Sequence, residues 1–482
     1  MCGVVGVVSK KPVNQELYDA LTVLQHRGQD SSGIMTDDQG VLCLRKSNGL
    51  VTDVFSEKHM LRLRGNMGIG HVRYPTAGGD DVNEAQPFYT ANPVNVTLAH
   101  NGTLTNSEKL KEELIKTHFC QFNTNSDSEV LLNLFCYELN NTNYRKLTKA
   151  HVFKAIKNIF RKCSGGYAVI MLVAGIGVVA FRDPKGIRPL AIGNNNGSFM
   201  VASESSAISS LGYKLLGDIA PGQAIIIDSG GTLDKKRLVR NAVHQPCIFE
   251  FVYFSRPDST LDEISVHKSR LRMGDFLGNK ILNEYKNIDV DVVIPVPDTS
   301  RTSAMQVAYK LGVKYREGFM KNRYIGRTFI MPGQNTRKKS VAQKLNPIEI
   351  EFKNKNVLLV DDSIVRGHTS KKIIQMVRKH GAKKVYFASA SPPIRYQNVF
   401  GIDMPATKEL VAHNRTIRQI KNYIGADELI YQDLESLRLS ASIGNPKITE
   451  YEDSVFTGNY CDSYVTKDYL NNLEKRRKDV SR

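Results

Sequence analysis

Three features that direct proteins to membranes or out of the cell are missing from this sequence. The longest apolar stretch, residues 167–181, has 15 residues and contains Gly175 and Gly177, so it is too short to span a membrane. The N-terminus lacks the charged start and the small-residue cleavage site of a secretory signal. The seven cysteines are scattered and never occur as Cys-x-x-Cys, which argues against a disulfide framework and a zinc site. We therefore expect a cytoplasmic protein with reduced thiols and no membrane partner.

The sequence is basic but contains no stretch typical of nucleic-acid binding. Its 66 lysines and arginines outnumber 48 aspartates and glutamates, which gives a net charge of +18. These residues are spread along the chain and are not gathered between aromatic residues, so we expect solvated charge, a local anion site and no nucleic-acid partner. With 482 residues, 41% of them hydrophobic, the chain is long enough for two large domains or three smaller ones.

One stretch, residues 357–370, combines two kinds of ligand chemistry. Residues 357–360 predict a buried parallel strand, and Asp361 and Asp362 follow at its carboxyl end, where a crevice opens in doubly wound sheets. The chain then turns into a helical pattern that runs to about Lys379. A helix N-terminus suits a phosphate, and paired carboxylates suit sugar hydroxyls and Mg²⁺. Paired aspartates also follow strands in phosphoacceptor and nucleotide-hydrolysing domains. With its loop, however, the stretch resembles the type I phosphoribosyltransferases, which bind phosphoribosyl pyrophosphate.

Cys2 is the candidate nucleophile at the other end of the chain. Met1 precedes a small residue and is expected to be removed, which would leave Cys2 with a free α-amino group before the strand predicted at residues 3–8. A terminal cysteine therefore combines a nucleophilic thiol with a general base on one residue. Taken alone, a cysteine at position 2 is better explained as a chance occurrence than as a catalytic residue.

Four later segments give Cys2 a context: residues 25–33, 70–78, 98–106 and 126–129. Each one alone has an explanation as turn or helix-capping chemistry. With Cys2 and in this order, they resemble the N-terminal-nucleophile amidotransferase domain, which hydrolyses glutamine to glutamate and ammonia.

The resemblance implies a role for each residue of this first site. Cys2 would attack the side-chain amide of glutamine, and the Asn101 side chain with the Gly102 N–H would form an oxyanion hole. Arg73 would pair with the α-carboxylate of glutamine, and Asp127 would hold its α-ammonium. Scaffold roles are expected for three histidines, His26, His71 and His100.

The expected fold changes class between the halves. Short strands between residues 167 and 223 fit an αββα sandwich of two stacked antiparallel sheets (α+β), which we assign to residues 2–230. Residues 228–246 are polar, basic and Gly-bearing and predict the connection between the domains. Residues 247–445 predict a doubly wound parallel sheet (α/β), starting with a strand at 247–255, a helix at 266–286 and a strand at 291–295. Residues 446–482 predict C-terminal helices with a basic tail.

Two further segments are expected at the second site. The turn at residues 298–301 opens a predicted helix, and in the resembled family a side chain here helps to hold Mg²⁺; Ser300 is the matching position. Residues 318–348 contain seven basic and no acidic residues, which predicts a lid over pyrophosphate with Lys321 and Arg327 among its contacts. A solvated face is the alternative for such a run.

Together the two halves resemble the glutamine phosphoribosylpyrophosphate amidotransferase family over nearly the whole chain. That resemblance implies glutamine cleavage at Cys2 and internal transfer of ammonia to phosphoribosyl pyrophosphate. It also implies a homodimer or homotetramer and feedback inhibition by purine nucleotides. Mg²⁺ would be held by Asp361, Asp362 and Ser300. The 5-phosphate would lie in the loop formed by Val365, Arg366, Gly367, His368, Thr369 and Ser370.

Three departures from the family pattern concern His368, His267 and Asn398. His368 stands where Thr is usual, which removes one hydroxyl contact to the phosphate, and His267 stands where Tyr is frequent. Asn398 stands where some members have a cysteine ligand, so we expect no iron–sulfur cluster. The alternatives are another amidotransferase, a nucleic-acid regulator with this fold, and a non-catalytic homologue.

Overall fold

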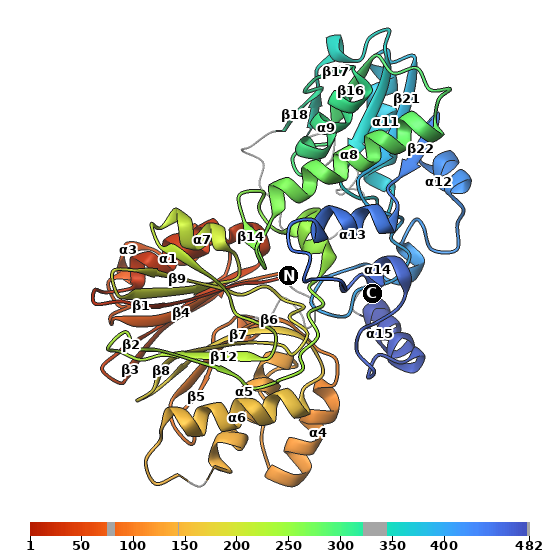
Figure 1. Cartoon of the computed structure of the whole chain (residues 1–482). Helices are drawn as coiled ribbons and strands as arrows, with labels where there is room; N and C mark the ends of the chain where they lie inside the picture. The colour runs from red at the N-terminus through yellow and green to blue at the C-terminus, as the bar shows by residue number, and fades with distance from the viewer. Residues whose placement is uncertain (75–81, 143, 322–344, 480–482) are drawn as a thin grey trace.

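The N-terminal half contains two antiparallel sheets packed face to face (Figure 1). The computed structural model describes residues 1–74, 82–142, 144–321 and 345–479. The first sheet has the strand order β11-β9-β10-β1-β4-β2-β3. Its strands are β1 Gly3–Val8, β2 Ser31–Asp38, β3 Val41–Asn48, β4 Met67–Arg73, β9 Ala191–Asn195, β10 Ser198–Ala202 and β11 Lys214–Asp218. The second sheet has the order β13-β12-β8-β7-β6-β5. Its strands are β5 Phe88–Thr90, β6 Val96–Leu104, β7 Gly165–Val173, β8 Gly177–Arg182, β12 Gln223–Ile227 and β13 Leu233–Arg237.

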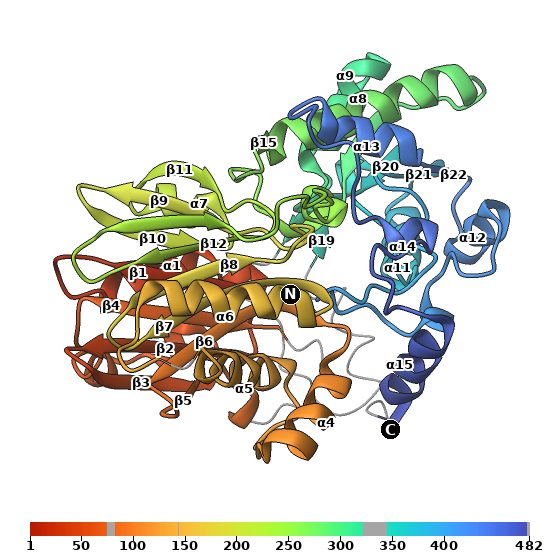
Figure 2. The same ribbon diagram turned by 60° about the horizontal axis from the view of Figure 1, so that its bottom comes forward.

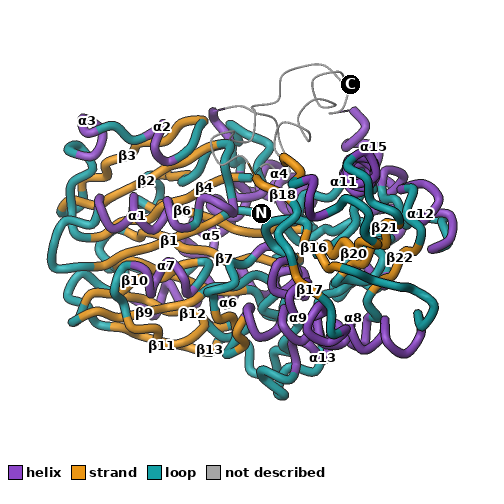
Figure 3. The backbone as a smooth tube through the Cα atoms, turned by 90° about the horizontal axis from the view of Figure 1, so that it is seen from above, coloured by secondary structure: helices purple, strands orange, loops and turns teal. Residues whose placement is uncertain are grey.

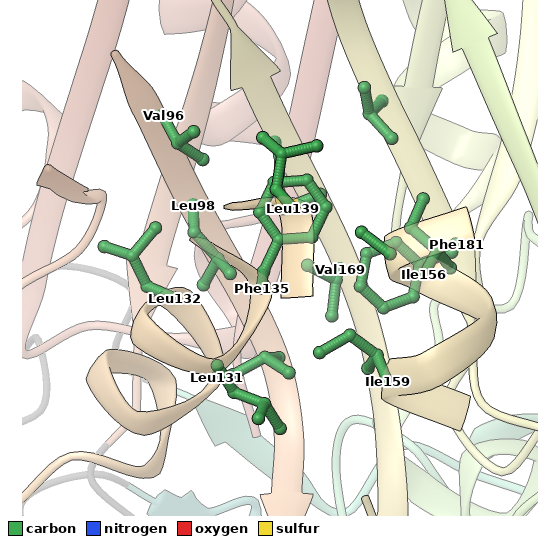
Figure 4. Packing of buried hydrophobic residues seen from close by; sticks show 14 of the residues in the cluster. Val96, Leu98, Leu131, Leu132, Phe135, Leu139, Ile156, Ile159, Val169 and Phe181 are labelled. Carbon is green, nitrogen blue, oxygen red and sulfur yellow. The ribbon is translucent and has the colours of Figure 1, made fainter. Parts of the chain in front are cut away.

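Alternate residues of these strands face different layers, as the two-residue period of a strand requires. On β1, Val5 and Val7 pack with the helices of the first sheet, whereas Val4 and Val8 pack between the sheets. The helices on that outer face are α1 (Asn14–Val23) and α7 (Ser205–Ser210). The other outer layer is formed by α5 (Asp127–Asn140) and α6 (Lys149–Lys162), which bury Phe135 and Ile156 against the second sheet (Figure 4). The predicted αββα sandwich is confirmed.

The second half is built on a parallel five-stranded sheet. Its order is β17-β16-β20-β21-β22. The strands are β16 Val292–Pro295, β17 Lys314–Tyr315, β20 Asn356–Asp361, β21 Lys384–Ser389 and β22 Glu428–Tyr431. Helices α8 (Val266–Glu284) and α9 (Arg301–Leu311) cover one face, and α11 (His368–Lys379) and α12 (Ile417–Ile424) cover the other (Figure 3). The predicted doubly wound sheet is confirmed.

The two halves meet at a shared core in which the chain's N-terminus is buried (Figure 2). Met1 packs there with Ile187 of the sandwich and with Phe249 and Phe400 of the second half. The C-terminal helices α13 (Leu434–Ser442), α14 (Ser454–Thr457) and α15 (Lys467–Asp479) lie along this side. The smaller elements are α2 Val51–Val54, α3 Glu57–Met60, α4 Ser107–His118, β14 Thr260–Leu261, β15 Ile264–Ser265, β18 Phe319–Lys321, β19 Leu345–Pro347 and the short turns η1 Gln25–Arg27, η2 Val82–Glu84, η4 Glu349–Glu351 and η5 Thr407–Glu409.

Two sequence expectations differ from this fold. The strand predicted at residues 247–255 is wrong: Cys247 makes one isolated bridge to Glu452, and η3 (Glu250–Phe254) is a π-helix. The run is buried in the core between the halves, and a short apolar run does not separate a strand from a buried helical turn. The connection predicted from residue 228 also starts too early, because β13 pairs with β12 and extends the sandwich to Arg237.

Candidate active sites

Cys2 lies where β1 begins, in the middle of the first sheet. Its backbone N–H donates to Asn101 Oδ1 at 3.2 Å, and its Sγ contacts the carbonyl oxygen of Tyr74 at 3.7 Å. The Met1 amine in front of it is enclosed as well, and burial lowers the pKa of that amine to about 6. Cys2 and Asn101, which are far apart in sequence, are thus brought together by the packing of the two sheets.

Asn101 and Gly102 present hydrogen-bond donors beside the thiol. The Asn101 side chain is fully buried, and its Nδ2 group has no hydrogen-bond partner among the described residues. Gly102 has a φ of +145°, and a Cβ at this position would lie 2.0 Å from the carbonyl oxygen of Gly166 on β7. Only glycine fits there. A buried donor without a protein partner is suited to an oxygen that gains negative charge during a reaction.

Arg73 and Asp127 are the residues of opposite charge that the sequence predicts for this site. Arg73 is at the end of β4 and is nearly buried, with its Nη2 atom 3.7 Å from Glu84 Oε2. Asp127 is the first residue of α5, and its Oδ2 atom accepts the Leu104 N–H at 2.9 Å. A ligand that carries both a carboxylate and an ammonium group, as an amino acid does, is complementary to this pair.

Two of the three histidines near this site, His71 and His100, are buried, whereas His26 is exposed. Burial lowers the pKa of His71 to about 3, and one of its ring nitrogens lies 3.2 Å from the carbonyl oxygen of His100. Burial also lowers the pKa of His100, whose Nδ1 atom lies 3.0 Å from Ser128 Oγ. His26 lies 2.7 Å from Glu204. The scaffold roles expected for the three histidines remain predictions.

The second site lies at the carboxyl end of β20. Asp361 accepts the Asp362 N–H at 2.9 Å, and Ser363 donates its hydroxyl to Asp362 at 2.6 Å. Burial, followed by the neighbouring Asp362 carboxylate, raises the pKa of Asp361 well above its ordinary value. Burial also raises the pKa of Asp362. Two desolvated carboxylates side by side are a fitting site for a divalent cation, whose charge favours the ionised form of both.

The loop that follows forms the start of α11. Gly367 has a φ of +72°, as a left-handed turn requires, and the Val365 carbonyl accepts the Val411 N–H at 2.9 Å. Arg366 pairs with Glu409 at 2.9 Å at the surface. The His368 ring is turned toward α12, where its Nδ1 atom lies 2.9 Å from the Tyr423 hydroxyl. The backbone N–H groups of the first helical turn, which include those of Thr369 and Ser370, are therefore donors of the kind that suits an anion.

The turn after β16 differs in detail from the sequence expectation. Ser300 is fully buried and donates its hydroxyl to the carbonyl of Val296 at 2.5 Å, so its hydroxyl proton is directed into the protein. Thr299, which was given no role, hydrogen-bonds to Asp362 instead and favours its ionised form. Lys321 reaches this turn from β18 and pairs with Asp298 at 2.6 Å. Arg327 and most of the predicted lid lie outside the described residues.

Arg270 on α8 gave no sequence signal. It is buried, its guanidinium donates to the carbonyls of Phe251 and Ser255, and its charge lowers the pKa of Asp362. Within the described residues, no group of three or more His, Cys, Asp or Glu side chains is arranged to hold a metal. A metal at Asp361 and Asp362 would therefore take its other ligands from substrate oxygens and water, as Mg²⁺ commonly does.

No helix in the described part of the chain has the length and apolar character needed to cross a membrane. A glutamine amidotransferase domain matches residues 71–210, and a phosphoribosyl transferase domain matches residues 260–392.

The chain is 55% identical to the amidophosphoribosyltransferase of Pseudomonas aeruginosa, over 100% of this chain and 97% of that protein. Two solved structures are each 35% identical in sequence to this chain. Glutamine phosphoribosylpyrophosphate amidotransferase from B. subtilis, complexed with ADP and GMP, has a TM-score of 0.85 and aligns over 97% of this chain and 98% of its own. The other structure, described as the allosteric regulatory enzyme of purine biosynthesis, has a TM-score of 0.87 and aligns over 98% of this chain and 99% of its own.

Proposed function

The chain belongs to the amidophosphoribosyltransferase family, and from this premise we propose how its residues divide the work of the reaction. The reaction consumes one water and transfers the amide nitrogen of glutamine to phosphoribosyl pyrophosphate, which gives 5-phosphoribosylamine, glutamate and pyrophosphate. It is the first committed step of purine synthesis. The observation that carries the assignment of the first site is the Asn101 side chain, which meets the Cys2 N–H and keeps a free buried donor beside it.

Glutamine hydrolysis takes place at Cys2 in this proposal. After removal of Met1, the α-amine of Cys2 takes the thiol proton as the sulfur attacks the amide carbon. Asn101 Nδ2 and the Gly102 N–H donate to the oxygen that becomes negative in the tetrahedral intermediate. Arg73 and Asp127 hold the carboxylate and ammonium groups of glutamine and so keep its amide against the sulfur. The amine then returns its proton to the departing ammonia, which leaves a γ-glutamyl thioester on Cys2. Water, deprotonated by the same amine, attacks this thioester, the C–S bond breaks, and glutamate and the free thiol are released.

The phosphoribosyl step takes place at the carboxyl end of β20. Asp361 and Asp362 hold the ribose hydroxyls, and the loop from Val365 to Ser370 holds the 5-phosphate on backbone N–H groups. Lys321 and the lid that includes Arg327 neutralise the pyrophosphate. Ammonia forms the new C–N bond at the anomeric carbon while the C–O bond to pyrophosphate breaks, so the protein's contribution is positioning and charge neutralisation.

Family enzymes generally use Mg²⁺ with phosphoribosyl pyrophosphate, and Asp361 and Asp362 are the residues of this chain that fit it. When bound there, Mg²⁺ would neutralise charge on the leaving pyrophosphate. Ser300 as a further ligand remains a prediction, and Thr299 has the hydrogen bond to Asp362 that Ser300 lacks. The absence of an iron–sulfur cluster also remains a prediction; Asn398 donates to Glu452 at 3.2 Å at that position.

The remaining parts of the proposal concern the whole molecule. Cys2 lies close to the junction of the halves, which supports internal transfer of ammonia (Figure 1). We assign the glutaminase to residues 2–237, the phosphoribosyltransferase to residues 247–445 and a C-terminal extension to residues 446–482. We further propose a cytoplasmic homodimer or homotetramer that purine nucleotides inhibit.

The test follows glutamate and pyrophosphate in parallel, using purified protein, glutamine and Mg²⁺, with and without phosphoribosyl pyrophosphate. We expect both products to appear in equal amounts and only with both substrates present. Glutamate without pyrophosphate would contradict the second site, and pyrophosphate that appears only with added ammonia would contradict the first.

A further inference from the structure

One glycine of the phosphoribosyl half packs against the backbone of Gly102. Gly401 lies in the segment after β21 and has a φ of +100°. A Cβ at Gly401 would lie 2.8 Å from the Cα atom and 3.0 Å from the carbonyl carbon of Gly102. On its other side, Gly102 has the carbonyl oxygen of Gly166, 2.0 Å from where its own Cβ would be. The backbone of Gly102 is thus confined between β7 of its own domain and a turn of the other domain.

Asn398 fixes that turn. Its side chain is fully buried, and its Oδ1 atom accepts the N–H groups of Phe400 at 2.8 Å and Ile402 at 3.1 Å. Its Nδ2 group donates to Glu452 at 3.2 Å. The Asn398 side chain therefore hydrogen-bonds to both residues that flank Gly401 and links them to Glu452 in the C-terminal segment.

The same segment begins at the phosphoribosyl site. Ser389, the last residue of β21, is paired with Asp361 in the parallel sheet. The next N–H group, that of Ala390, donates to the carbonyl of Asp361 at 2.8 Å. About a dozen residues of continuous, mostly buried chain then lead from Asp361 to the contact at Gly102. The turn at Gly401 is therefore held at two places, by the sheet at Asp361 and by the hydrogen bond from Asn398 to Glu452.

We propose that the turn at residues 399–402 forms the back of the oxyanion hole and that Asn398 is its positioning residue. This turn confines the backbone of Gly102 and so fixes the direction of the Gly102 N–H donor. This inference rests on the proposed function, since it assumes that Gly102 serves glutamine hydrolysis. Asn398 touches no reacting atom and acts through Phe400, Gly401 and Ile402.

The experiment compares Gly401→Ala and Asn398→Ala with a matched control, Gly425→Ala. Gly425 also has a positive φ, +81°, but a Cβ there meets nothing within 4 Å, so the control adds the backbone strain without the contact. For each full-length protein, kcat and KM are measured for glutamine-dependent pyrophosphate release, and again with ammonia as the nitrogen donor. Glutamate release is also measured with and without phosphoribosyl pyrophosphate.

Gly401→Ala is expected to lower the glutamine-dependent kcat by about tenfold or more, since loss of one complete oxyanion donor costs on the order of 100- to 1,000-fold. The KM for glutamine should stay within about twofold, because Arg73 and Asp127 still bind the substrate. Asn398→Ala should also lower the glutamine-dependent kcat and keep the KM for glutamine within about twofold. Ammonia-dependent activity, which reports that each variant is folded, should match that of Gly425→Ala and the wild type.

The inference is overturned if Gly401→Ala keeps the wild-type glutamine-dependent kcat, or if glutamine- and ammonia-dependent rates fall together in both variants. A wild-type glutamine-dependent kcat in Asn398→Ala would remove the positioning role of Asn398. A wild-type protein that releases no pyrophosphate with glutamine would instead contradict the proposed function.

Discussion

Replacement of Asn101 by alanine should separate stability from activity. In the structure this side chain makes one hydrogen bond, to the Cys2 N–H at 3.2 Å, and buries one donor with no partner among the described residues. Loss of the bond costs about 1 kcal/mol, but removal of a buried unpaired donor returns about as much, so the free energy of unfolding should change little. The catalytic loss should be large, about 2.7–4 kcal/mol, which corresponds to a 100- to 1,000-fold lower kcat with glutamine.

Asn106 offers a matched comparison in the same domain. Its side chain is also nearly buried, but both ends are used: Nδ2 donates to the Lys162 carbonyl at 2.7 Å, and Oδ1 accepts the Ser164 N–H at 3.0 Å. Asn106→Ala should therefore cost about 2 kcal/mol of stability, because it leaves two partly buried backbone groups unpaired, and should keep glutamine turnover.

The assay pairs thermal unfolding with glutamate release for both variants and the wild type. We expect Asn101→Ala to unfold near the wild-type temperature with little turnover, and Asn106→Ala to unfold earlier with nearly full turnover below its transition. If Asn101→Ala kept its kcat within about threefold, or if its loss of activity followed a loss of stability, the oxyanion role would be refuted.

Three further predictions test other parts of the structure. Asp127→Asn keeps the acceptor for the Leu104 N–H but loses the charge, so the KM for glutamine should rise about 10- to 100-fold, as expected for a charge-assisted bond of about 1.5–3 kcal/mol; a KM within threefold of the wild type would contradict this. His368→Thr restores a hydroxyl to the phosphate loop, so the KM for phosphoribosyl pyrophosphate should fall about 2- to 10-fold, whereas Tyr423→Phe, which removes only the partner of His368, should not lower it. Burial, followed by Asp262, raises the pKa of Asp218 to about 8, so the folded protein holds a proton that the unfolded chain has released, and this contribution to stability is lost as pH rises from about 4 to 8. Asp218→Asn has no carboxyl group to titrate, so it should not lose this stability. Its unfolding temperature should exceed that of the wild type by a margin that grows between pH 5 and 8. A constant margin would contradict the raised pKa of Asp218.

The fold class followed from the sequence because both halves carry strong local patterns. The apolar run before Asp361 and the alternating strands of the sandwich have the periods of buried and half-buried strands, and the structure confirms both architectures. The strand predicted at residues 247–255 was wrong because this run is buried between the two halves. Local periodicity does not distinguish a strand from a helical turn in such surroundings. The sequence likewise did not predict strand β13. Its residues are mostly polar and basic, and β13 forms a strand because it pairs with β12.

The site residues were found where a motif fixes them and missed where only packing does. The structure brings Cys2 and Asn101 together as the motifs predicted, although their roles remain predictions. Thr299 and Ser300 are adjacent polar residues, and sequence alone did not tell which one faces Asp362. Arg270 and Gly401 have no motif at all; their positions become informative only once the neighbouring residues are known.

The most direct test of the two-site account is the activity of Cys2→Ala with each nitrogen donor. Pyrophosphate release from phosphoribosyl pyrophosphate is measured with glutamine and with ammonia, with Cys43→Ala, a half-buried cysteine on β3, as the control. The account predicts that Cys2→Ala loses the glutamine-dependent reaction and keeps the ammonia-dependent one, while the control keeps both. Loss of both activities in a folded Cys2→Ala protein, or retention of both, would contradict it.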